Sequence, residues 1–154
     1  MTNVFRCLSL AFLLSLNVAA VAANDDERSM RAIENRQGLL KVTGHYMGPI
    51  VGMARGQIPF DADVIAHHAT QIGHLTGMLP DLFRMDTRGS SAPTEAKGII
   101  WDNLEDFAAK AKTSQDRAQA LVAATSEGKG PTLKAFGALG NSCKGCHDKY
   151  REKK

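Results

Sequence analysis

Apolar residues recur at intervals of three and four along most of this chain, and that spacing constrains the fold more than any other feature. Phe107, Ala111 and Ala118, for example, fall on one side of a helix with 3.6 residues per turn. No stretch shows a convincing alternation of period two, which a half-buried strand would require. Clusters of Gly and Pro interrupt the helical pattern. We therefore expect four helices, over about residues 26–53, 62–79, 94–126 and 131–150.

Individual residues indicate where these helices begin and which side they bury. Asp61 is expected to cap the start of the second helix, and Pro131 to occupy the first position of the fourth. The longest connection is expected over residues 81–93. The inward stripe of the first helix is predicted to contain Ile33, Gln37, Leu40, Gly44, Met47 and Val51.

The first 23 residues have the pattern of a secretory signal peptide. A basic Arg6 precedes an apolar run from Cys7 to Leu16, and small residues continue to Ala23. The run is shorter than the ~20 residues that a bilayer span needs, and no second run reaches that length. We expect cleavage after Ala22 or Ala23, export to the periplasm, and a mature domain over residues 24–154 with no membrane span.

The charge of the mature chain is close to balanced. The full sequence has 19 basic and 16 acidic residues, and loss of Arg6 leaves 18 basic residues and a net charge of +2. This balance argues against nucleic acid as a partner. The remaining ~130 residues suffice for one hydrophobic core without disulfides. Four amphipathic helices joined mainly by short connections then predict an all-α, antiparallel four-helix bundle, whose core can hold a cofactor.

The chemistry of the chain is concentrated in the motif Cys143-Lys-Gly-Cys146-His147. On a helix, positions i, i+3 and i+4 share one face, so both thiols and the imidazole can bind the same group. The pattern is typical of haem c, in which two sulfurs bond the porphyrin and the histidine binds iron. A zinc finger lacks its second pair of ligands, and a thioredoxin-like dithiol belongs in a βαβ setting. We predict one covalently attached haem c with His147 as axial ligand.

Three glycines surround the motif at a cost of roughly 1 kcal/mol each relative to alanine in a helix. Gly137, Gly140 and Gly145 indicate either close approach of the haem or of another helix, or a loosely packed terminal helix.

The residues alone leave the sixth position of the iron open. Spacing forces none of the upstream histidines or methionines into it, and such residues more often serve as core or surface groups. The candidates are His45, His67, His68, His74, Met47, Met53, Met78 and Met85.

The chain resembles cytochrome c′, of the class II cytochromes c. The resemblance rests on Arg36-Gln37-Gly38-Leu39-Leu40, on Trp101 in the predicted third helix, and on residues 143–147 followed by Asp148, Tyr150 and Arg151. It implies a four-helix bundle, a homodimer formed through the first two helices, and His147 as proximal ligand. It also implies that Arg36 and Gln37 meet a haem propionate, a role that guanidinium–carboxylate pairing explains.

The same resemblance points to an open iron. Low-spin relatives in class II carry a methionine ligand at the position that Leu40 occupies here. Leucine has no lone pair, so we expect five-coordinate, high-spin iron with Leu40 and Thr43 lining the distal pocket. Arg151, four residues after His147, is expected on the proximal side. Glu95 and Lys97 correspond to positions that approach the haem edge in the family.

These residues predict a periplasmic haem protein that binds nitric oxide or carbon monoxide and exchanges electrons between Fe(II) and Fe(III). The alternative is a low-spin electron carrier with an upstream Met or His as sixth ligand and a redox partner protein. Peroxidase-like turnover requires a distal acid–base group, which Leu40 does not offer, so we do not expect an enzyme.

Overall fold

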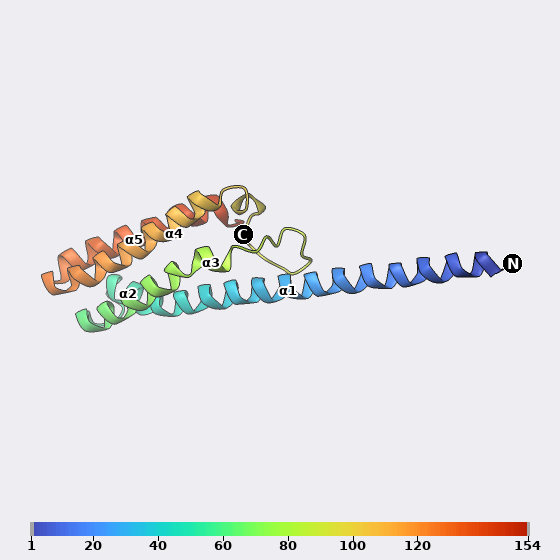
Figure 1. Ribbon diagram of the computed structural model, residues 1–154. Helices are drawn as coiled ribbons and strands as arrows, with labels where there is room; N and C mark the ends of the chain where they lie inside the picture. Colours follow the sequence, from blue (N-terminus) through green and yellow to red (C-terminus); the bar gives the residue numbers. More distant parts are fainter. Residues whose placement is uncertain (1, 154) are drawn as a thin grey trace.

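Four long helices form the bundle in the computed structural model, which describes residues 2–153 and the side chains of residues 25–153. They are α1 (Thr2–Ala54), α2 (Ala62–Gly77), α4 (Leu104–Ala124) and α5 (Lys129–Tyr150) (Figure 1). A single turn, α3 (Leu79–Leu82), and two 3₁₀ turns, η1 (Gly98–Ile100) and η2 (Thr125–Glu127), lie in the connections. The predicted all-α, four-helix architecture is confirmed.

The N-terminal part of α1 extends beyond the bundle (Figure 1). The predicted signal peptide, residues 1–23, lies outside the residues whose side chains are described, and it stays a prediction. Among the described residues, no helix is both long enough and apolar enough to cross a membrane.

One core cluster joins all four helices. Its centre is made by α2 and α4, where Ala69, Gly73 and Ala118 are buried. A Cβ at Gly73 would lie 3.5 Å from the Cβ of Ala118, so these small residues let the two helices approach closely. The buried members of this first cluster are Ile50, Met53, Ile65, Ala69, Ile72, Ala118, Leu121 and Leu139.

A second, more aromatic cluster joins α3, η1, α4 and the end of α5. Phe107 is its centre, with ring centroids 4.6 Å from Phe83 and 5.4 Å from Tyr150. Such tilted and edge-on ring pairs add to the free energy of area burial. The buried members are Leu79, Phe83, Ile100, Phe107, Ala111 and Tyr150.

The start of α2 agrees with the sequence prediction, and the start of α5 differs from it. The carboxylate of Asp61 accepts hydrogen bonds from the backbone amides of Asp63 and Val64, both at 3.0 Å, so the predicted N-cap is confirmed. Helix α5 begins at Lys129, so the prediction that Pro131 occupies its first position was wrong: the chain breaks at Gly128, whose φ of 97° is a conformation that side chains other than glycine rarely adopt.

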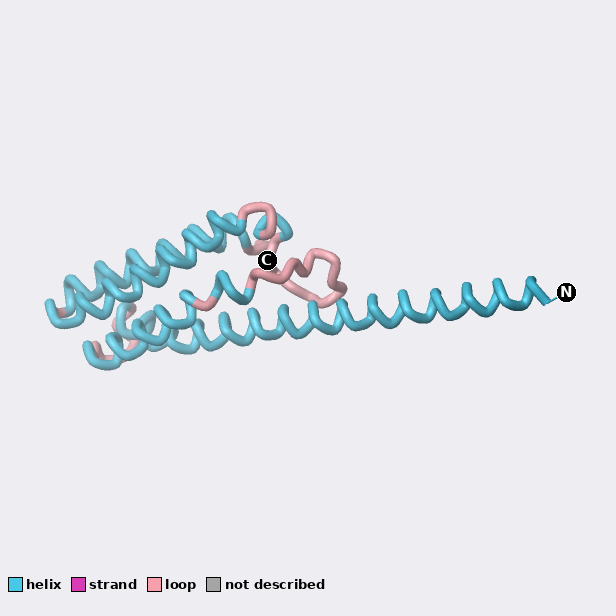
Figure 2. The backbone as a smooth tube through the Cα atoms, viewed as in Figure 1, coloured by secondary structure: helices cyan, strands magenta, loops and turns pink. Residues whose placement is uncertain are grey.

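The predicted third helix was wrong at its start. It begins at Leu104 instead of residue 94, and Trp101 lies in the turn after η1. Residues before it use their backbone groups elsewhere: the amide of Lys97 donates to the carbonyl of Tyr150 at 2.9 Å. Figure 2 shows the long connection between α3 and α4, which reaches back to α1.

The predicted inward stripe of α1 was also partly wrong. Gln37, Leu40 and Gly44 are exposed. The buried side instead contains Ile33, Arg36 and Ile50, with Leu39, Thr43 and Met47 half-buried between them. A charged residue, Arg36, belongs to this buried side. A prediction that considers apolar residues alone therefore places the buried stripe wrongly.

Replacing Ile72 with Ala should lower the free energy of unfolding by about 2–5 kcal/mol, because Ile72 is fully buried in the first cluster. The matched control is Ile99→Ala, since the Ile99 side chain is 44% exposed and should change stability by less than about 0.5 kcal/mol. Urea unfolding of the purified protein measures both values. Equal losses for the two variants would contradict the assignment of this core.

Candidate cofactor site

The motif lies in the last two turns of α5, a helix that is fixed at both ends. At its start, the fully buried Thr132 donates through its hydroxyl to the carbonyls of Ala124 at 3.1 Å and Gly128 at 2.7 Å. At its end, the hydroxyl of Tyr150 donates to a carboxylate oxygen of Asp106 at 2.5 Å. Helix α5 is therefore not a loosely packed terminal helix.

The two thiols border different core clusters. Cys143 packs against the first cluster and Cys146 against the second, and both are half-buried and not in a disulfide. Burial is the main cause that raises the pKa of each thiol, while hydrogen bonds from Ser142 and Ser114 act in the opposite direction on Cys143. Both cysteines are thus neutral thiols near neutral pH.

Helix α1 is divided between the clusters in the same way. Leu39 packs against the second cluster and Met47 against the first, with Thr43 one turn from each. The stretch of α1 that carries the predicted distal residues therefore borders the same two clusters as the two thiols. Leu40, on this stretch, is 41% exposed, and Thr43 donates its hydroxyl to the carbonyl of Leu39 at 2.9 Å.

His147 has an accessible imidazole at the end of the motif. Partial desolvation by neighbouring protein atoms is the main cause that lowers its pKa, and the positive charge of Arg151 lowers it further. The carboxylates of Asp148 and Glu95 act in the opposite direction. A lowered pKa favours neutral imidazole, which is the form that binds a metal.

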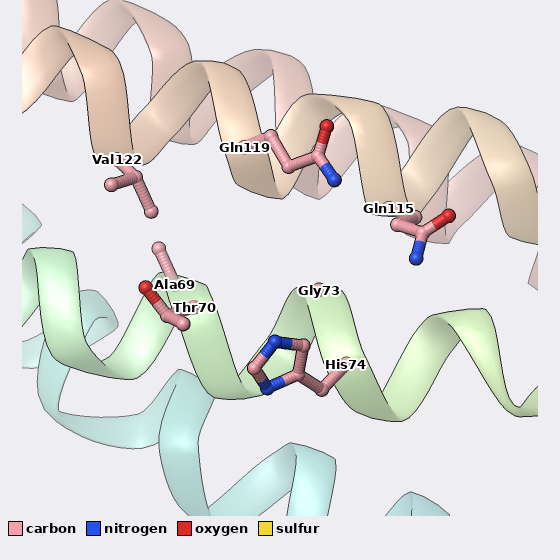
Figure 3. Close-up of a pocket in the computed structure, with 7 residues that line it drawn as sticks. All are labelled: Ala69, Thr70, Gly73, His74, Gln115, Gln119 and Val122. Carbon is pink, nitrogen blue, oxygen red and sulfur yellow. The ribbon is translucent and has the colours of Figure 1, made fainter.

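The upstream histidines lie in two other places. The rings of His45, His67 and His68 surround Tyr46, and Nδ1 of His68 lies 2.9 Å from the carbonyl oxygen of Tyr46. His74 lines a shallow groove of about 190 Å³ between α2 and α4 (Figure 3).

The upstream methionines differ in their surroundings. Met53 is buried in the first cluster, and Met78 is 53% exposed. Met47 packs against the first cluster, as Cys143 does. Met47 is therefore the methionine whose position fits best with a role near the motif.

Arg36 is almost fully buried and holds the connection between α3 and α4. Its Nε donates to the carbonyl of Leu82 at 2.8 Å, and its two terminal nitrogens donate to the carbonyl of Met85 and the hydroxyl of Thr87, both at 2.7 Å. The guanidinium carbon lies 4.6 Å from the ring centroid of Phe83. Burial lowers its pKa, and sequence reasoning missed this anchoring role because no local pattern connects residues so far apart.

Gln37 also contacts this connection, because its Nε2 donates to the carbonyl of Pro93 at 2.9 Å. These contacts use three of the five N–H donors of Arg36. The predicted contact of Arg36 and Gln37 with a haem propionate stays a prediction.

The predicted proximal and edge residues are brought together. Arg151 forms an ion pair with Glu95, and both charges act on His147. Lys97 contacts the same tail through its backbone amide, which bonds Tyr150. The structure therefore groups Arg151 and Glu95 beside the histidine of the motif.

The three glycines of α5 have open space beside them. A Cβ added at Gly137, Gly140 or Gly145 would meet no atom within 4 Å outside the helix's own backbone and chain neighbours. The prediction that another helix approaches them was therefore wrong, and approach of the haem is the interpretation that stays.

The match to known families decides what group this motif holds. A protein-family model described as Cytochrome C' matches residues 31–151. The chain belongs to the cytochrome c′ family. Members of this family carry covalently attached haem c, which confirms the predicted cofactor.

Relatives cover most of the chain. The cytochrome c′ of Pararhodospirillum photometricum is 39% identical over 121 residues, covering 78% of this chain and 95% of the relative. A cytochrome c-556 of Agrobacterium tumefaciens (strain B2A) is 35% identical over 122 residues, covering 79% and 98%. A solved cytochrome c′ from Rhodobacter spheriodes has a TM-score of 0.74 and 31% identity, covering 82% and 98%.

The residues present fit a haem c. Two neutral, half-buried thiols and an accessible imidazole project from one side of α5, and α1 presents an aliphatic stretch that borders the same clusters. Within the part of the chain that the structure describes, no group of three or more His, Cys, Asp or Glu could hold a metal ion. A porphyrin needs no such group, because it supplies four ligands itself, and His147 would supply a fifth.

Replacing both Cys143 and Cys146 with Ala should abolish covalent attachment, because the two thiols are the only described sulfhydryl groups that can bond the porphyrin. Acid extraction should then remove the haem completely, and the intact mass should equal that of the polypeptide. Each single variant should keep its haem through the remaining cysteine. Haem that resists extraction in the double variant would contradict the assignment.

Proposed function

We propose that this chain is a periplasmic haem protein with five-coordinate, high-spin iron that binds nitric oxide or carbon monoxide and also cycles between Fe(II) and Fe(III). The observation that carries this proposal is Leu40. An accessible aliphatic side chain occupies the stretch of α1 that borders the clusters of Cys143 and Cys146. Bound haem supplies an iron with one open position, and leucine has no lone pair to fill it.

The distal residues favour ligands that need no hydrogen bond. Dioxygen is helped by a distal donor, whereas nitric oxide and carbon monoxide bind without one. Thr43, three residues after Leu40 on α1, is polar, but its hydroxyl already donates to the carbonyl of Leu39. Leu40 then limits the space over the iron and excludes water from it.

A similar solved structure supports the choice of ligand. It is the nitric oxide complex of a leucine-to-alanine mutant of cytochrome c prime from Alcaligenes xylosoxidans, with a TM-score of 0.71 and 30% identity, covering 82% of this chain and 97% of that one. The relatives have more than one name, cytochrome c′ and cytochrome c-556. Family membership alone therefore does not specify the coordination of the iron, and our proposal for it is based on Leu40.

The second candidate function is a low-spin electron carrier, and Met47 is the observation that favours it. Met47 packs against the same cluster as Cys143 and carries a thioether that can bind iron. Docking to a redox partner would use basic residues near the motif. Lys144 and Lys149 pair with Asp148 and Asp106, however, which weakens a basic docking surface there.

The remaining features of the proposal follow from the sequence and the surface. The predicted signal peptide supports a periplasmic location. Homodimer formation through α1 and α2 is supported by exposed aliphatic side chains at Val42 on α1 and at Ile58 in the connection from α1 to α2, which are 45% and 42% exposed. Leu40 and Thr43 offer no acid–base group, which supports binding and electron transfer over enzymatic turnover.

Replacing Leu40 with Ala should accelerate carbon monoxide binding to the ferrous protein, because the ligand no longer has to displace the leucine. If that displacement costs about 1.4 kcal/mol, the rate constant rises about tenfold. Flash photolysis or stopped-flow mixing measures it. The matched control is Val42→Ala, which removes an equally exposed aliphatic group from α1 and should leave the rate unchanged. An unchanged rate in the Leu40 variant would refute its distal role.

Replacing Leu40 with Met should convert the iron from high spin to low spin, because a thioether then stands at the open position. The paired variant is Met47→Leu, which should leave the visible spectrum of the wild-type protein unaltered. Loss of a low-spin spectrum on changing Met47 would instead identify this residue as the sixth ligand and establish the second candidate function.

A further inference from the structure

The residues that follow α5 turn back and bond to the segment before η1. The amide of Lys97 donates to the carbonyl of Tyr150 at 2.9 Å, and the amide of Glu152 donates to the carbonyl of Glu95 at 2.8 Å. These bonds accompany an antiparallel bridge between Ala96 and Arg151. The backbone of Arg151 is therefore fixed against residues that lie more than fifty positions earlier in the chain.

Arg151 is also tied to the histidine of the motif. Its own amide donates to the carbonyl of His147 at 3.0 Å, which is the last backbone bond of α5. A side chain four residues after His147 leaves the helix on the same side as the imidazole. Consequently the position of the guanidinium decides which charge and which donors His147 meets.

A single carboxylate determines where that guanidinium lies. The Nε and one terminal nitrogen of Arg151 lie 2.7 Å and 2.6 Å from the same oxygen of Glu95. Both side chains are more than a third exposed, and such a pair contributes little to the stability of a fold. The backbone bridge already joins the two segments, so the ion pair is better explained by orientation than by folding.

We propose that Glu95 is a positioning residue for the proximal side of the haem: it holds the guanidinium of Arg151 beside His147 and keeps two of its donors directed at the carboxylate. This inference rests on the proposed ligation of iron by His147. It gives Glu95 a role through Arg151, which differs from the direct contact with the haem edge that the family resemblance implies.

The test uses proton NMR of the ferric haem protein, in which the ring protons of an axial histidine have hyperfine-shifted resonances. Glu95→Gln should shift the His147 resonances, because the guanidinium loses its charged partner. Arg151→Gln should shift them as well. The double variant should resemble Arg151→Gln alone, since Glu95 acts through Arg151 and the two effects are not additive.

The control is Glu152→Gln, which removes the same charge from the other side of the bridge, in the tail that follows α5. Glu152 joins the bridge through its backbone amide, which the substitution keeps, so the His147 resonances should not move. Hydrogen exchange of the Lys97 and Glu152 amides should remain slow in Glu95→Gln, showing that the bridge is intact.

Three results would overturn the proposal: unchanged His147 resonances in Glu95→Gln, an equal shift in Glu152→Gln, or loss of amide protection in Glu95→Gln. The first result would mean that Glu95 has no influence on His147. The second would mean that any nearby negative charge shifts the resonances, and the third that the shift comes from loss of the backbone bridge. The resonances can be read in high-spin and low-spin protein alike. Failure of the five-coordinate proposal is therefore distinguishable, because it shows in the spin state of the wild-type iron.

Discussion

In the site that we propose, the fixed relation between two thioether bonds and one iron ligand is the constraint on which the other features depend. Cys143, Cys146 and His147 reach one rigid group from one side of α5, so the depth and rotation of this helix set the position of the haem. Thr132 fixes the start of the helix with two hydrogen bonds, and Tyr150 fixes its end on Asp106. Neither residue belongs to the motif, yet both help to fix where it lies.

The opposite wall of the site depends on α1 in a different way. Arg36 is buried on this helix and bonds the last residue of α3 and two groups of the connection that follows it. This connection leads to Glu95, whose carboxylate orients Arg151 beside the motif. The helix that carries Leu40 and the end of α5 are thus joined through one long loop, and Leu40 is the side chain that we propose to limit access to the iron.

Local patterns predicted the parts of the fold that local interactions determine. The N-cap at Asp61 was predicted correctly because its hydrogen bonds are made within three residues. The haem motif was recognisable because its three groups share one turn. The start of α4 was wrong because the backbones of Glu95 and Lys97 bond residues at the distant end of α5 and after it. The buried stripe of α1 was misplaced because Arg36 satisfies its charge with groups more than forty residues away.

The central claim is that the iron has no protein ligand opposite His147. Electron paramagnetic resonance of the ferric protein, together with visible spectra of both oxidation states, tests it most directly. The account predicts high-spin iron in both states for the unmodified protein. A low-spin spectrum with a methionine-to-iron charge-transfer band would contradict it.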